Sequence, residues 1–175
     1  KQAEEMIEQN MHYPQFPILL LETINAHIAG LGNPDKLIRM SAGVHFKNCI
    51  RKYWSIQKDE DGNIINYSGV GDENVNIANN QNNLNNNITI TANGDSVYVI
   101  PEEQKTVIRE NIVTIMCEVT DDVQKVLCEA LSLISNVDFP NNWQNLLPEM
   151  ISHFNSEDFH KINGVLTCAN AIFKR

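Results

Sequence analysis

Basic residues are scarce in this chain of 175 residues. Lysine and arginine number 13 against 22 aspartates and glutamates, so the formal net charge is -9. A surface that binds nucleic-acid phosphates needs clustered lysine and arginine to displace counterions. The composition therefore argues against nucleic-acid binding and favours basic protein partners.

Long apolar runs are also missing from the sequence. No segment approaches the run of about 20 apolar residues that spans a bilayer, and no charged-then-apolar secretory leader opens the chain. We therefore expect a protein that does not bind membranes and that works in the cytosol or the nucleus.

The cysteines do not form a recognisable metal or redox motif. Cys49, Cys117, Cys128 and Cys168 lie far apart, make no C-x-x-C pair and fall inside apolar helical patterns. This distribution predicts four free, buried thiols in a reducing compartment.

Catalytic and metal-binding patterns are equally scarce. Gly69-Val70-Gly71 lacks the third glycine of a phosphate-binding turn, and the paired acids occur where helices are expected to begin, where they favour the helix dipole. The histidines show no H-x-x-x-H spacing and are expected on the surface or at the core edge: His12, His27, His45, His153 and His160. We predict a protein that is not an enzyme and that has no cofactor.

Apolar residues recur at helical spacing along most of the chain. Pro17 suits the first turn of one helix, and Ser156-Glu157-Asp158 caps the last one. The expected helices cover approximately residues 3–10, 17–29, 33–54, 101–116, 121–138, 146–154 and 158–173.

Three of these helices share a frame in which an apolar, a small and a large residue follow at steps of four. The small residue allows a neighbouring helix to approach closely, and 39 residues separate Ala130 from Ala169, close to the period of about 40–47 typical of HEAT repeats. The three frames are Ile38-Ala42-Phe46, Val126-Ala130-Ile134 and Val165-Ala169-Phe173.

Residues 59–99 interrupt this pattern as a low-complexity insert. The asparagine-rich run at 79–87 cannot bury enough apolar surface to offset its ordering entropy. Residues 88–91 and 96–100 alternate around Asn93-Gly94, which indicates a β-hairpin. We expect the insert to leave the helical stack and to return to it.

Three segments carry a resemblance to a known family. Residues 44–54 (VHFKNCIRKYW) and 138–143 (DFPNNW) resemble the Phe-Lys-Asn…Trp and Asp-Phe-Pro-x-x-Trp segments of importin-beta-like nuclear transport receptors. Residues 160–166 (HKINGVL), running on to Phe173-Lys174-Arg175, are similar to the branch of that family that re-exports importin-alpha.

The resemblance implies an all-α, right-handed superhelical solenoid of HEAT repeats over residues 1–175, from a partial first repeat to a fourth, with the insert inside it. It further implies a shuttling export receptor that binds Ran-GTP, importin-alpha as cargo, and nucleoporins. In such receptors the inner helices face Ran. The residues that match those positions are Lys47, Asn48, Arg51, Gln124 and Ser135.

Two alternatives remain open at this point. One is another import or export receptor of the same family. The other is a HEAT-repeat scaffold without Ran binding, such as a subunit of a phosphatase or of a chromosome-organising complex. For Asn48, hydrogen bonding between neighbouring repeats is as good an interpretation as partner contact, and Trp54 and Trp143 are expected to be buried between repeats.

Overall fold

The computed structural model describes residues 13, 15–26, 33–55, 88–90 and 96–173. Within this part of the chain most residues are helical, and the predicted segment at 3–10 lies outside it. The helices are α2 (Phe16–Asn25), α3 (Asn33–Tyr53), α4 (Glu102–Glu118), α5 (Asp121–Asp138), α6 (Leu146–Phe154) and α7 (Phe159–Phe173).

The helix starts follow local chemistry that is visible in the sequence. Pro17 lies in the first turn of α2, where its missing N–H costs no hydrogen bond. Asp121 and Asp122 lie in the first turn of α5, where negative charge favours the helix dipole. The His160 N–H donates to the Asp158 carboxylate at 2.9 Å, so the predicted cap before α7 is confirmed.

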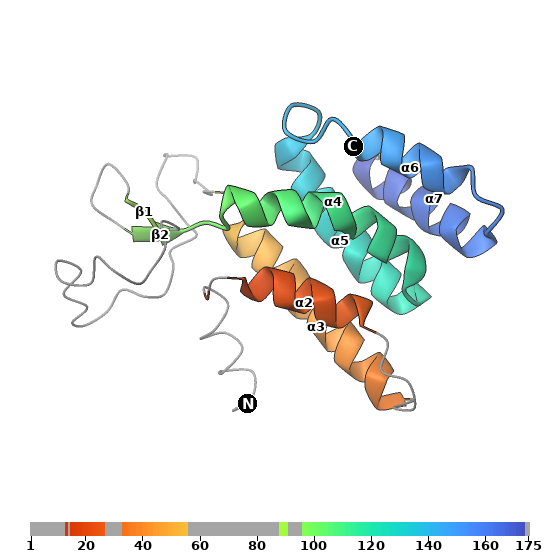
Figure 1. Cartoon of the computed structure of the whole chain (residues 1–175), viewed down its shortest axis with the longest axis horizontal. Coiled ribbons are helices and arrows are strands. Elements are labelled where there is room, and N and C mark those ends of the chain that lie inside the picture. The colour runs from red at the N-terminus through yellow and green to blue at the C-terminus, as the bar shows by residue number, and fades with distance from the viewer. Residues whose placement is uncertain (1–12, 14, 27–32, 56–87, 91–95, 174–175) are drawn as a thin grey trace.

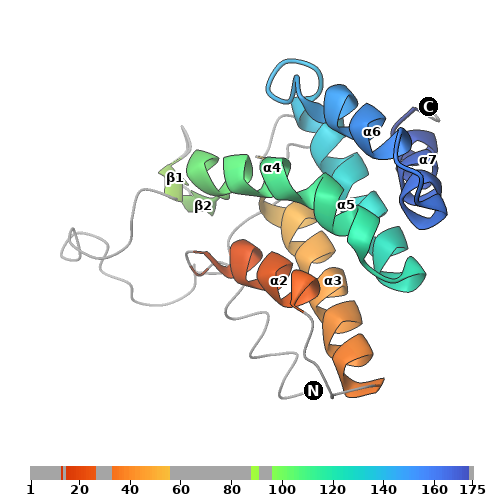
Figure 2. The same ribbon diagram turned by 45° about the vertical axis from the view of Figure 1, so that its right-hand side comes forward.

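The helices form two layers of antiparallel pairs (Figures 1 and 2). Each pair places one helix in each layer: α2 with α3, α4 with α5, and α6 with α7. In the first layer α2 contacts α4, and α4 contacts α6. In the second layer α3 packs on α5, and α5 packs on α7. Consecutive pairs therefore stack side by side, which is the arrangement of a helical solenoid.

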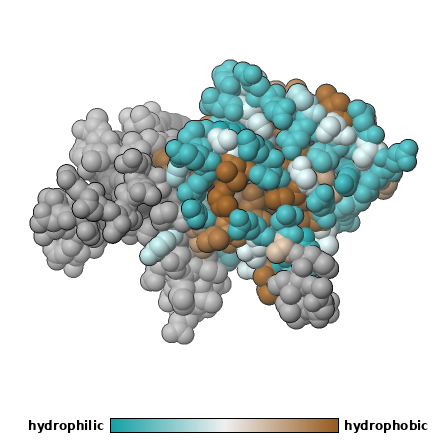
Figure 3. Space-filling model, in the orientation of Figure 1, coloured by the Kyte–Doolittle hydropathy of each residue, from teal (hydrophilic) through white to brown (hydrophobic). Residues whose placement is uncertain are grey.

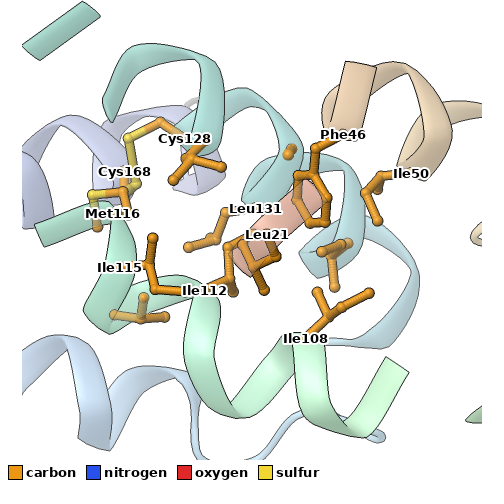
Figure 4. Close-up of a cluster of buried hydrophobic side chains, with 14 of the residues drawn as sticks. Leu21, Phe46, Ile50, Ile108, Ile112, Ile115, Met116, Cys128, Leu131 and Cys168 are labelled. Carbon is orange, nitrogen blue, oxygen red and sulfur yellow. A yellow bond between two sulfur atoms is a disulfide. The ribbon is translucent and has the colours of Figure 1, made fainter. Parts of the chain in front are cut away.

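A single apolar core joins the two layers (Figure 4). Leu21 from α2, Phe46 from α3, Ile112 from α4 and Leu131 from α5 are all buried in it. Ala42 and Ala130, the small residues of the first two frames, are buried at 6% and 0% exposure. Ala169, in the third, is partly buried and packs against the same core.

The frame is less successful at two of its outer positions, one apolar and one large. Ile38 and Phe173 were predicted on the buried face, but they are 43% and 54% exposed. Ile38 lies near the start of α3 and Phe173 is the last residue of α7, so neighbouring helices cover each only in part. Period alone does not show where a helix extends past its neighbours.

Two glycines lie where helices pack against one another. A Cβ atom on Gly43 would lie 3.5 Å from Cγ1 of Val126, an ordinary contact between α3 and α5. A Cβ atom on Gly164 would lie 2.9 Å from Cδ of Gln124 and 3.3 Å from Sδ of Met116. The α7 backbone thus packs so closely on α4 and α5 that position 164 has no room for a side chain.

Gly164→Ala is therefore expected to lower the free energy of unfolding by about 1–3 kcal/mol, because Gln124 must leave its buried position. Urea denaturation measures this change. Gly43→Ala is the matched control, since its methyl group has room and alanine favours helix, and it should leave stability unchanged or raise it by up to about 1 kcal/mol. Equal stability of the two variants would show that the α7 packing is looser than the structure indicates.

Two of the four cysteines are not the free thiols that were predicted. Cys49 and Cys117 are free and buried, as predicted. Cys128 and Cys168 instead form a disulfide between α5 and α7, with their Cα atoms 5.1 Å apart. The prediction of four free thiols is wrong for this pair. The two residues occupy corresponding places in successive repeats, which brings them together across the second layer.

The segments on either side of the insert lie next to each other. The Ile100 N–H donates to the Tyr53 carbonyl at 2.9 Å, so the chain returns beside the end of α3 before α4 begins. Two short strands, β1 (Ile88–Ile90) and β2 (Ser96–Tyr98), pair antiparallel with Thr89 opposite Val97. Asn93-Gly94 and the asparagine-rich run lie outside the described residues.

The outer face of the first layer carries an apolar area bordered by hydrophilic residues (Figure 3). It lies over the region where α2 and α4 run side by side. Leu19 of α2 and Val107 of α4 are 54% and 42% exposed.

Candidate partner-binding face

Helix α3, in the second layer, is amphipathic: one side is buried in the core, and the adjacent side carries charged and polar residues. Phe46, Cys49, Ile50 and Tyr53 are buried against neighbouring helices. The residues between them, at 47, 48, 51 and 52, are half-buried or exposed. The helical period therefore places Lys47, Asn48 and Arg51 together on one surface. We call these three residues the α3 patch.

Lys47 is the most constrained member of the α3 patch. Its ammonium lies 2.8 Å from Oε2 of Glu129 on α5, and its side chain is 17% exposed. Asn48 is half-buried, and Arg51 is exposed. Lys47 and Arg51 are one turn apart, so both can reach the same partner surface.

The other two predicted residues lie inside the molecule. Gln124 is 2% exposed, and its side-chain amide donates to the Met116 carbonyl at 3.1 Å. Ser135 is 1% exposed, and its hydroxyl donates to the Ser132 carbonyl at 3.0 Å. Gln124 joins α5 to α4, Ser135 bonds within its own helix, and neither side chain contributes to the surface of the α3 patch.

A buried polar network links the two segments that carried the family resemblance. Asp138 is 5% exposed and accepts hydrogen bonds from the Trp54 indole at 3.1 Å and from Arg109 at 2.8 Å. Arg109 also pairs with Glu102 at the start of α4. The network therefore joins the end of α3 to α4 and α5.

Both tryptophans have the structural role that the sequence indicated. Trp54 is 2% exposed and Trp143 is 4% exposed, so the prediction that they are buried between repeats is confirmed. The sequence analysis missed Arg109 and Glu129. No short motif identifies them, because Arg109 and Glu129 bond residues that are 29 and 82 positions away.

The described residues provide little for catalysis. Burial raises the pKa of the Cys49 thiol to about 12 and that of Cys117 to about 11, so neither thiol is a nucleophile at neutral pH. Among these residues, no three His, Cys, Asp or Glu side chains group as metal ligands. No helix in the same part of the chain is both long and apolar enough to span a membrane.

The stacked helix pairs place this protein in the class of helical-repeat solenoids, and the α3 patch gives this solenoid a charged surface beside its core. Proteins of similar sequence identify the family within this class. Residues 3–118 match the family model described as the importin-beta N-terminal domain. The chain belongs to the importin-beta family, as the segments at 44–54 and 138–143 indicated.

Individual relatives agree with this assignment. The chain is 32% identical to exportin-2 of Oreochromis niloticus and of Homo sapiens over 171 residues, which is 98% of this chain. It is 31% identical to exportin-2 of Danio rerio over 173 residues, or 99% of this chain. The chain spans 13% to 14% of the length of these relatives.

A solved structure gives the same result. The structure described as "The exportin Cse1 in its cargo-free, cytoplasmic state" is similar over 100% of this chain and 15% of its own, with a TM-score of 0.65 and 25% identity. The predicted helical-repeat solenoid and the likeness to the exporter branch are both confirmed.

Proposed function

We propose that this chain is the N-terminal, Ran-GTP-binding part of a nuclear export receptor that returns importin-alpha from the nucleus to the cytoplasm. The observation that carries the proposal is the 32% identity to exportin-2 over 98% of the chain. Because the chain spans 13% of that relative, the proposal concerns the longer receptor to which such a segment would belong.

The α3 patch supplies chemistry that suits a Ran contact. Lys47 and Arg51 can donate charge-assisted hydrogen bonds to carboxylates and carbonyls of a partner, and such bonds are about twice as strong as neutral ones. Asn48 lies between them and can both donate and accept. The buried network of Trp54, Asp138 and Arg109 holds the end of α3 rigidly, so the patch is ordered before a partner arrives.

Solenoid geometry gives a mechanism for coupling the two partners. Curvature depends on small rotations between stacked pairs, so a ligand that contacts several repeats stabilises one curvature. If Ran-GTP and importin-alpha prefer the same curvature, each raises the affinity for the other by the same factor. Hydrolysis of GTP in the cytoplasm would then release both. In this proposal the receptor binds its partners and catalyses no reaction. It shuttles between nucleus and cytoplasm. Nucleoporin binding stays a prediction.

The experiment that tests the proposal is a titration of the longer receptor with Ran loaded with GTP or GDP. We expect the GTP form to bind at least about tenfold more tightly, and added importin-alpha to strengthen that binding further. Equal affinity for the two nucleotide forms, or no binding of either, would contradict the proposal and favour a scaffold without Ran binding.

A further inference from the structure

The contact between α3 and α5 contains two ion pairs of different character. Lys36 lies 2.9 Å from Asp122, and both side chains are more than half exposed, at 56% and 54%. Lys47 lies 2.8 Å from Glu129, but here the exposed fractions are 17% and 58%. Both side chains of the first pair are solvated, whereas the second pair joins the end of a largely covered lysine side chain to an exposed carboxylate.

This asymmetry has an energetic consequence. A lysine packs its aliphatic stem against neighbouring residues while its ammonium stays at the surface, so a largely covered side chain fixes where that charge lies. The exposed carboxylate of Glu129 can move into solvent at small cost, since exposed ion pairs contribute only about 0.2–1 kcal/mol. The covered stem therefore holds Lys47 in place, while the exposed Glu129 side chain can move away and be replaced by a carboxylate of a partner.

We propose that Glu129 acts as an internal competitor for the partner, occupying Lys47 in the unbound receptor until a carboxylate of the partner displaces it. This inference rests on the proposed function, because it concerns how the α3 patch binds Ran-GTP. Glu129 then sets the affinity of the receptor although it lies on a different helix from the patch. Displacement also returns the Glu129 carboxylate to water, next to the newly formed contact.

Glu129→Gln in the longer receptor tests this competition, because it removes the charge and keeps the size of the side chain. We expect the dissociation constant for Ran-GTP to fall by about two- to fivefold, which corresponds to the usual strength of an exposed pair. The gain should disappear in the background of Lys47→Gln, since the competitor acts only through Lys47. The melting temperature should fall by no more than a few degrees, because an exposed pair contributes little to stability.

Glu110→Gln is the matched control for net charge. Glu110 is an exposed glutamate on α4 in the first layer, away from the α3 patch, and its substitution should leave the affinity unchanged.

The outcomes separate this inference from the proposed function. Weaker binding by Glu129→Gln would show that Glu129 assists the contact. Unchanged binding would show that Lys47 binds the partner without displacing Glu129. Either result overturns the role of Glu129 as a competitor and leaves the proposed function standing. If the gain in affinity persists in the Lys47→Gln background, or if Glu110→Gln produces the same gain, the effect comes from net charge in general. Either result also overturns the role of Glu129 as a competitor. No binding of Ran-GTP by the unmodified receptor overturns both.

Discussion

Asp138→Ala is expected to lower the free energy of unfolding by about 3 kcal/mol or more, because it removes one of the two carboxylates that pair with the buried Arg109. Asp138 is 5% exposed and bonds both the Trp54 indole and Arg109. Glu102 would still pair with Arg109, so the loss should lie near the lower end of the range of about 3–5 kcal/mol measured for broken buried pairs. The Trp54 N–H would lose its acceptor in a site closed to water, which adds to the loss.

Urea denaturation of the variant measures this loss directly. Asp122→Ala is the matched control, because it removes the same side chain from the same helix but breaks an exposed pair with Lys36. Its cost should be much smaller than that of Asp138→Ala, because both side chains of this pair are exposed to solvent. Equal losses for the two variants would mean that the network of Trp54, Asp138 and Arg109 does not hold the three helices together.

The second large effect is expected on binding. In the longer receptor, Lys47→Glu combined with Arg51→Glu should weaken Ran-GTP binding by at least about 30-fold, corresponding to about 2 kcal/mol, because attraction becomes repulsion at a partly desolvated contact. The fold should survive, since neither side chain belongs to the core. Repulsion between residue 47 and Glu129 adds only a surface-pair cost.

Lys36→Glu combined with Lys161→Glu changes the net charge by the same amount elsewhere. These lysines pair with Asp122 and Glu118, near the turn between α4 and α5. Their reversal acts on the α3 patch mainly through screened, long-range forces, so affinity should stay within about threefold of the unmodified receptor. Unchanged affinity in the first double variant would remove Lys47 and Arg51 from the binding face.

Local signals in the sequence were enough to predict most of the helices. The acids at the start of α5 and the cap before α7 are short-range features, and α5 ends at Asp138, as the expected helix over 121–138 does. The alanine frame then placed Ala42 and Ala130 correctly in the core. Each of these predictions depends on residues within a few turns of one another, where helical geometry fixes the neighbours.

The features that the sequence did not reveal all depend on contacts between distant helices. The Cys128–Cys168 disulfide and the tight packing of Gly164 on Gln124 depend on how α7 is oriented relative to α5. Gln124 and Ser135 illustrate the same limit, because family position suggested a partner contact while both side chains are buried in the repeat contacts. Helical period identifies the buried side of a helix, but the partner of each side chain depends on how the pairs stack.

Site-specific photocrosslinking in the longer receptor tests directly whether the α3 patch faces Ran. A photoreactive residue would replace Arg51 on α3 or, as the control, Val107, which is 42% exposed on α4 in the first layer. We predict a crosslink to Ran from position 51 with GTP bound, little or none with GDP, and none from position 107. A crosslink from position 107 alone, or equal yields from position 51 with both nucleotides, would contradict the assignment of the second layer as the Ran-GTP-binding face.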